Sequence, residues 1–98
     1  MTRPIRFDPA AQRELNEAAD FYDAEDPGLG GGFLDAIDRA VEQIQAFPES
    51  SPISVAPVRI KVLSAFPFSI IYWATDEAII VLAVAHHRRR PEHWRGRE

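Results

Sequence analysis

The side chains best suited to chemistry lie at the C-terminal end of the chain. Residues 86–98 contain all three histidines, His86, His87 and His93, together with five arginines and Trp94. Imidazole titrates near neutral pH and can act as a general acid or base, whereas guanidinium groups carry a fixed charge that suits phosphate. Such a segment could serve acid–base chemistry on a phosphodiester or the binding of an anionic surface.

Metal, nucleotide and cofactor sites find little support in the sequence. Adjacent residues of a strand point to opposite faces, so His86 and His87 are poorly placed to share an ion, and the chain has no cysteine and no HExxH motif. The glycines at 28 and 30–32 lead to Phe33 rather than to the Lys-Ser/Thr of a phosphate loop. We therefore expect no metal site, no bound nucleotide and no cofactor.

Charge is unevenly distributed along the chain, whose formal net charge is −4. Between Asp8 and Glu49, eleven carboxylates accompany only Arg13 and Arg39, whereas the C-terminal end is basic. We interpret the carboxylates as the solvated faces of helices rather than as an acid–base pair. The separation predicts that the two ends of the chain meet different surfaces, the basic end an anionic one.

The length of 98 residues suits one domain, to which we assign residues 1–98. The longest apolar stretch, residues 78–85, is much shorter than the ~20 residues of a membrane-spanning helix. The absence of cysteine leaves the redox compartment open. We expect a soluble, cytoplasmic protein that does not enter the membrane.

The first half of the chain has the pattern of a short strand followed by two helices. Residues 5–7 are a candidate strand, and Asp8-Pro9 is typical of a helix start. Apolar residues recur at helical spacing up to Tyr22 and again from Phe33 to Phe47. We expect the glycines at 28 and 30–32 to form a tight turn between two antiparallel helices.

The second half has the pattern of three strands. Residues 58–62 alternate apolar and basic side chains, and residues 68–74 and 78–86 are joined by a short turn, as in an antiparallel hairpin. The last strand is apolar at every position from Ile79 to Ala85. Such a strand is either central in its sheet or covered on both faces, and a partner could supply the second cover.

Motifs distributed over the whole chain resemble the RelE/ParE superfamily of type II toxins, and the ParE branch most closely. This resemblance implies an α+β fold, with a small antiparallel sheet packed against a two-helix hairpin in the order β-α-α-β-β-β. It also implies a cognate antitoxin and a target in DNA gyrase or the translating ribosome. The motifs are Asp8-Pro9-Ala10-Ala11, Glu14-Leu15, Phe21-Tyr22, Pro27-Gly28-Leu29-Gly30, Phe33 with Ile37, Phe47-Pro48, Phe66-Pro67-Phe68, Ile71-Tyr72, and His86-His87-Arg88-Arg89-Arg90-Pro91 with Trp94.

The resemblance leaves a ribosome-dependent RelE-like endoribonuclease open as an alternative. Similar nucleases place an arginine where this chain has Ser69 and a C-terminal tyrosine where it has Trp94, and indole cannot exchange a proton at a useful pKa. A histidine could replace the tyrosine. The nuclease would then use Arg59, Lys61, His86, His87 and Arg88.

We favour a ParE-like toxin that inhibits gyrase, arrests growth and stabilises plasmids without itself being an enzyme. A net charge of −4 is unfavourable for work among ribosomal phosphates, and arginine and tryptophan are common at protein interfaces. An inactive interaction module of the same fold is the third interpretation. The residues expected to bind the target are Arg88, Arg89, Arg90 and Trp94.

The resemblance further implies an antitoxin segment that lies across the helical hairpin and the sheet. Carboxylates along both helices would favour basic side chains in that segment. We expect no direct DNA binding by the toxin alone, and a homodimer and a heterotetramer with the antitoxin both stay open. The expected antitoxin-binding residues are Leu15, Ala18, Tyr22, Phe33, Ile37, Phe66 and Trp73.

Overall fold

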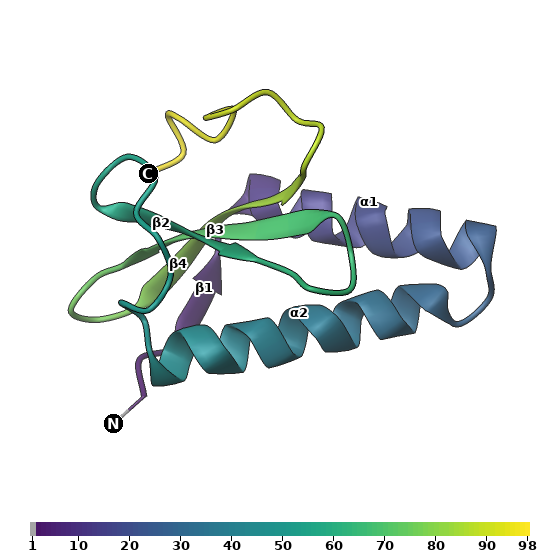
Figure 1. The fold of residues 1–98 in the computed structure, drawn as a ribbon, viewed down its shortest axis with the longest axis horizontal. Helices are drawn as coiled ribbons and strands as arrows, with labels where there is room; N and C mark the ends of the chain where they lie inside the picture. Colours follow the sequence, from purple (N-terminus) through teal and green to yellow (C-terminus); the bar gives the residue numbers. More distant parts are fainter. Residues whose placement is uncertain (1) are drawn as a thin grey trace.

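A computed structural model describes residues 2–98 and has the α+β architecture expected from the sequence. A hairpin of two helices lies on one side of a four-stranded sheet, and the C-terminal residues leave the end of β4 and loop back over the sheet (Figure 1). The predicted order β-α-α-β-β-β is confirmed. The elements are β1 (Ile5–Phe7), α1 (Pro9–Glu25), α2 (Leu29–Ala46), β2 (Val58–Val62), β3 (Phe68–Ala74) and β4 (Ile79–His86).

The sheet is mixed rather than antiparallel throughout. Its strand order is β1-β4-β3-β2. The pairs β2–β3 and β3–β4 are antiparallel, whereas β1 is parallel to β4. The chain leaves β1 through the helical hairpin and two strands before it reaches β4, and this long connection allows a parallel pair. The most apolar strand, β4, therefore lies inside the sheet, one of the two arrangements predicted for it.

Local signals set the limits of the helices. The Asp8 carboxylate accepts a hydrogen bond from the Ala10 N–H at 2.9 Å, and Pro9 occupies the first turn of α1. The connection to α2 is shorter than predicted, because Gly30, Gly31 and Gly32 belong to the first turns of α2 and only residues 26–28 link the helices. The assignment of all four glycines to a turn was therefore wrong.

Gly30 explains why glycine is needed inside α2. A Cβ atom at this position would lie 2.5 Å from the Ala19 carbonyl oxygen of α1 and 2.7 Å from the Asp23 carboxylate. The Gly30 N–H also donates to that carboxylate at 2.7 Å. The absence of a side chain at Gly30 thus lets the two helices approach closely at the tip of the hairpin.

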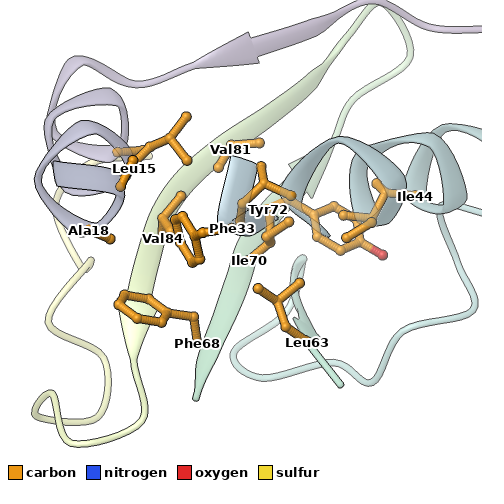
Figure 2. Packing of buried hydrophobic residues seen from close by; sticks show 14 of the residues in the cluster. Leu15, Ala18, Phe33, Ile44, Leu63, Phe68, Ile70, Tyr72, Val81 and Val84 are labelled. Atoms are coloured by element: carbon orange, nitrogen blue, oxygen red, sulfur yellow. The ribbon is translucent and has the colours of Figure 1, made fainter. Parts of the chain in front are cut away.

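The main core fills the space between the helical hairpin and the sheet (Figure 2). Leu15 and Ala18 from α1 and Phe33 from α2 face Ile70 and Val84 of the sheet. The other members include Ile37, Ile44, Leu63, Phe68, Tyr72, Ile79 and Val81. The Tyr72 hydroxyl donates to the Pro48 carbonyl at 2.7 Å, which attaches the chain after α2 to the sheet.

A second core covers the opposite face of the sheet. Trp94, only 1% exposed, packs there together with Val58 of β2, Ile71 of β3 and Leu82 of β4. A register shift places both Leu82 and Ala83 opposite the same part of β3, so that both belong to this second core. The second face of β4, for which a partner was one predicted cover, is thus covered by the chain's own C-terminal residues.

We predict that Gly30→Ala lowers the free energy of unfolding by about 1–3 kcal/mol, since the added methyl group meets backbone atoms of α1. Gly31→Ala is the matched control, because a Cβ atom there has no neighbour within 4 Å, and it should be neutral or stabilising by up to about 1 kcal/mol. Urea unfolding measures both values. Equal effects of the two substitutions would contradict the close approach of the helices.

Candidate functional site

The C-terminal tail, defined here as residues 87–98, folds back over the sheet in a series of turns. The His87 N–H donates to the Pro67 carbonyl at 2.9 Å, and the Arg89 N–H donates to the His86 carbonyl at 2.9 Å. Beyond these turns, Trp94 inserts into the second core. The tail is therefore an ordered element, which suits a segment where Pro91 restricts the backbone and Trp94 buries a large apolar ring.

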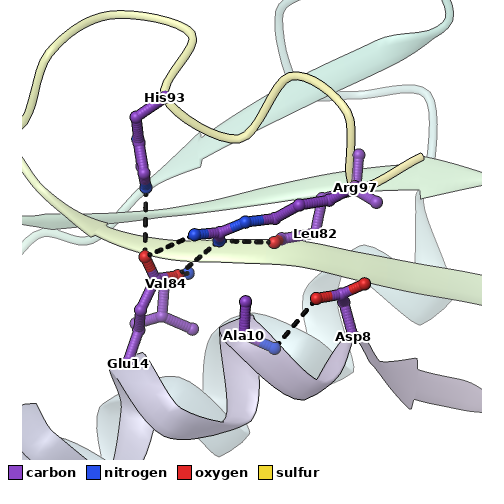
Figure 3. Close-up of polar contacts among 7 residues, drawn as sticks. All are labelled: Asp8, Ala10, Glu14, Leu82, Val84, His93 and Arg97. Atoms are coloured by element: carbon purple, nitrogen blue, oxygen red, sulfur yellow. Dashed lines mark hydrogen bonds and ion pairs between the residues drawn. The ribbon is translucent and has the colours of Figure 1, made fainter.

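The Glu14 carboxylate of α1 binds the end of the tail (Figure 3). Arg97 donates to both of its oxygens, at 2.9 and 3.2 Å, and His93 lies 3.1 Å from one of them. The Val84 N–H of β4 donates to the same carboxylate at 3.1 Å. Glu14 thereby joins a helix, a central strand and the tail.

The position of this cluster follows from the shortness of β1. The Asp8 N–H donates to the Val81 carbonyl at 2.9 Å, and the chain then turns into α1, which leaves the rest of that β4 edge without a strand partner. Arg97 donates to the Leu82 carbonyl at 3.0 Å, while Glu14 accepts from the Val84 N–H. Two side chains thus take the place of a neighbouring strand.

The Glu14 carboxylate is stabilised in its charged form. Burial is the largest single influence and raises its pKa, but the hydrogen bonds from Arg97, the Val84 N–H and His93, with the charge of Arg97, outweigh burial. The pKa of Glu14 therefore lies below its ordinary value of 4.5. At neutral pH the cluster holds a carboxylate anion against a guanidinium cation.

Arg88, Arg89 and Arg90, called here the arginine run, lie at the surface where the chain leaves β4. Among residues 2–98 the ion pairs join Glu14 to His93 and Arg97, and Glu92 to Arg95. The arginine run takes part in none of them. Its three positive charges are therefore presented outward from a turn whose two ends are anchored, at β4 and at Trp94.

Trp94 does not belong to this surface, although we predicted that it would bind the target. Its burial in the second core removes it from contact with a partner of the folded protein. A hollow beside the tail, about 300 Å³ in volume, is bordered by Trp94, Ser69, His87 and Arg90. Trp94 therefore anchors the turn that carries the arginine run, but it does not form part of that surface.

The residues that a nuclease would use are divided between the two faces of the sheet. Arg59 pairs with Tyr72 of the main core, and its guanidinium group donates to the carbonyl groups of Glu49 and Ser51. Lys61 follows on the same face, opposite Ile70.

His86 and His87 are also separated from each other. The His86 ring packs edge-on against Phe68 on the helix-bearing face, whereas His87 Nε2 lies 3.1 Å from the Ser69 hydroxyl, on the other face. Arg88 is exposed in the tail. The sheet thus separates His87 from Arg59, Lys61 and His86, which share the helix-bearing face.

Most of the residues that we predicted to bind an antitoxin lie in the interior. Leu15, Phe33 and Ile37 are buried in the main core, so they are not free to form the floor of a groove. Ala18 is also largely buried there, but it borders a groove at the surface. Periodicity alone could not separate the core side of a helix from a binding side. Tyr22 and Phe66 are half-buried beside that core, and Trp73 is half-buried on the opposite face, so the predicted set does not form one surface.

The structure contains a surface groove, which we call the edge groove, and of the predicted antitoxin-binding residues only Ala18 and Tyr22 line it. It has a volume of about 320 Å³ and runs between α1 and the part of β4 that β1 leaves uncovered. Phe21, 60% exposed, forms one wall, and burial raises the pKa of the neighbouring Tyr22. The lining residues are Glu14, Glu17, Ala18, Phe21, Tyr22, Phe68, Val84, His86 and Arg89.

Within residues 2–98 no group of three or more histidine, aspartate or glutamate side chains is arranged to hold an ion. No described helix combines the length and the apolar character needed to cross a bilayer.

Comparison with known proteins adds a family and a fold. The family model described as "ParE toxin of type II toxin-antitoxin system, parDE" matches residues 5–91. A solved structure described as "Chromosomal ParDE TA system from P. aeruginosa" superposes with a TM-score of 0.75 at 20% identity, covering 87% of this chain and 96% of that one. No curated protein matches the sequence at a significant level.

We predict that Glu14→Gln lowers the free energy of unfolding by about 2 kcal/mol at pH 7, because it removes the charge that Arg97 and His93 contact. Since folding lowers the pKa of Glu14, its contribution is complete above pH 4.5 and is lost as the pH falls through the folded pKa. The difference between wild type and variant should therefore shrink below pH 4.5.

Urea unfolding at several pH values between 7 and 3 measures this difference. Glu17→Gln, one turn along α1 and exposed, is the matched control and should change stability by less than about 0.5 kcal/mol. A Glu14→Gln effect that stays constant across this pH range would contradict the role of the charged carboxylate.

Proposed function

This chain belongs to the ParE toxin family of type II toxin–antitoxin systems, and we propose that it arrests growth by binding DNA gyrase. An antitoxin is the partner that such a system implies. We propose that the antitoxin silences the toxin by direct binding, and that the pair stabilises the replicon that encodes it. The cytoplasm, where gyrase works, is the compartment that this function requires.

The observation that carries the gyrase proposal is the anchored, unpaired arginine run. Arg88, Arg89 and Arg90 are exposed and have no ion pair within residues 2–98, while Trp94 and Arg97 hold the chain that follows them. Arginine is among the residues that contribute most to protein interfaces, and a pre-ordered loop loses less entropy on binding than a mobile one. This surface therefore suits an acidic patch on gyrase or on its complex with DNA.

The proposal favours binding over catalysis because of how the candidate nuclease residues are arranged. The Arg59 guanidinium group is bound to two carbonyl groups of the loop after α2, and His86 and His87 face opposite sides of the sheet. General acid–base catalysis requires its groups within hydrogen-bond reach of one substrate. The toxin thus acts as an inhibitor that makes contacts rather than one that cleaves RNA.

The acidic helices favour an antitoxin that carries basic side chains. Glu17 and Asp20 of α1 and Asp35, Asp38 and Glu42 of α2 are exposed and have no ion pair among the described residues. Complementary charge on a partner raises the rate of association and aligns the two surfaces. The two proposed partners therefore meet opposite charges on this small protein.

We predict that replacing Arg88 and Arg90 together by glutamine abolishes growth arrest and gyrase inhibition but leaves antitoxin binding within about threefold; Arg89 is kept because it lines the edge groove. Supercoiling and cleavage assays with purified gyrase measure the first effect, and titration with the antitoxin encoded beside the gene measures the second. The matched control replaces Arg6, Arg13 and Arg39, which are exposed elsewhere, and should keep inhibition.

Two results would contradict the gyrase proposal. One is codon-positioned mRNA cleavage in a programmed ribosome assay with gyrase unaffected. The other is normal growth when the wild-type chain is overproduced without its antitoxin.

We predict that the affinity for the antitoxin falls about tenfold or more between 50 and 500 mM salt, since screening weakens attraction between exposed charges. Isothermal titration at a series of salt concentrations measures it. A variant with Asp35, Asp38 and Glu42 changed to their amides should show a smaller slope. An affinity independent of salt would argue against a basic antitoxin surface.

A further inference from the structure

The edge of β4 is open beyond the cluster at Glu14. The His87 N–H donates to Pro67 on the β3 side, and Ala85 pairs with Ser69 of β3. Because successive residues of a strand direct their backbone groups to opposite edges, Val84 and His86 direct theirs away from β3, toward the edge groove. Glu14 binds the Val84 N–H from that side, which is the direction that this alternation requires.

Two backbone groups at this edge await a partner. Among residues 2–98, neither the Val84 carbonyl nor the His86 N–H makes a hydrogen bond to the backbone of a loop or a helix, and neither makes one to a side chain. In a parallel pair of strands, a residue of the added strand donates its N–H to the carbonyl of one residue in the existing strand. Its own carbonyl accepts from the N–H of the residue two positions later in that existing strand. The Val84 carbonyl and the His86 N–H have that spacing.

β1 already forms parallel hydrogen bonds of this kind to an earlier part of the same β4 edge. Ile5 pairs in parallel with Ile79, and the contact ends where the Asp8 N–H binds the Val81 carbonyl. A short segment that continued the line of β1 would lie beside residues 84–86. In this added segment, the two residues that flank the hydrogen-bonded residue would direct their side chains to the helix-bearing face, where Val84 and His86 line the edge groove.

We propose that this edge binds a short extended segment of the antitoxin, which adds to the sheet in parallel with β4 and places one apolar side chain in the edge groove. The inference rests on the proposed function and specifies how the antitoxin is recognised. Phe21, Tyr22 and Phe68 supply apolar contact for that side chain, while Glu17 on the rim faces basic residues beside it. Strand addition of this kind combines backbone hydrogen bonds with a pocket for one side chain.

A second copy of this chain is a poor occupant because none of its described edges suits parallel addition: two copies related by a twofold axis would pair residues 84–86 in antiparallel, and the other edges are partly bound or very short. Part of the outer edge of β2 is bound by its own loop, since the Ile60 N–H donates to the Pro52 carbonyl and the Ser54 N–H to the Val58 carbonyl. β1, at the other edge, has only three residues. The added strand must therefore come from another protein.

The first test compares two substitutions at His86 in complexes with the full-length antitoxin encoded beside the gene. His86→Pro removes the outward N–H and should weaken binding about tenfold, whereas His86→Ala keeps the N–H and should stay within about threefold of wild type. Both variants lose the imidazole ring and its bond to the Arg88 N–H, so they differ only in the backbone. Circular dichroism and urea unfolding confirm that each variant is folded.

The second test concerns the edge groove. Phe21→Ser should weaken antitoxin binding about tenfold or more, because it removes an exposed apolar wall. Phe47→Ser is the matched control, since Phe47 is 69% exposed and lies outside the groove, and it should have no effect.

Amide hydrogen exchange distinguishes the addition of an antitoxin strand from other modes of binding. The His86 N–H should exchange rapidly in the free toxin and become protected in the complex, while the Ala85 N–H, directed toward β3, is protected in both. A complex in which His86 stays unprotected and His86→Pro binds like His86→Ala overturns the inference but leaves the proposed function intact. Loss of binding in Phe21→Ser, combined with a His86 N–H that stays unprotected in the wild-type complex, would indicate a docked helix and would also overturn it. Failure of the wild-type chain to bind the antitoxin would instead refute the proposed function.

Discussion

The structure depends on how the chain completes the edge of β4 where β1 ends. A three-residue β1 leaves backbone groups of an interior strand without a partner, and such groups are costly to leave unsatisfied. Glu14 and Arg97 supply the missing hydrogen bonds from opposite ends of the sequence. One carboxylate therefore connects the first helix, the central strand and the C-terminal tail, and the position of the arginine run follows from this connection.

The tail contributes to the fold as well as to the proposed interface. Trp94 covers a face of β4 and β3 that the helices cannot reach, and burial of so large an apolar side chain is a strong force that holds the tail against the sheet. The arginine run lies between this anchor and the end of β4. Its order on the surface is thus a consequence of core packing rather than of contacts made by the arginines themselves.

Charge and shape give the protein two distinct surfaces. Carboxylates occupy the exposed sides of α1 and α2, whereas the turn that follows β4 is basic. The edge groove lies between them, with Glu17 on α1 and Arg89 in the tail both among its lining residues. A toxin that must bind a target and an antitoxin can in this way present a different charge to each.

The order of the elements, the helix start at Asp8-Pro9 and the burial of Trp94 could be predicted from the sequence alone, because they follow from apolar periodicity, local capping and the cost of exposing a large ring. Tertiary structure decided the rest. Periodicity places Leu15 and Phe33 on an apolar side without saying whether the core or a partner covers it, and alternation cannot reveal that β1 pairs in parallel with β4. The contact of Gly30 with α1 and the meeting of Glu14 with Arg97 join residues that are distant in sequence. Such pairings depend on the packing of the whole chain, so no local pattern encodes them.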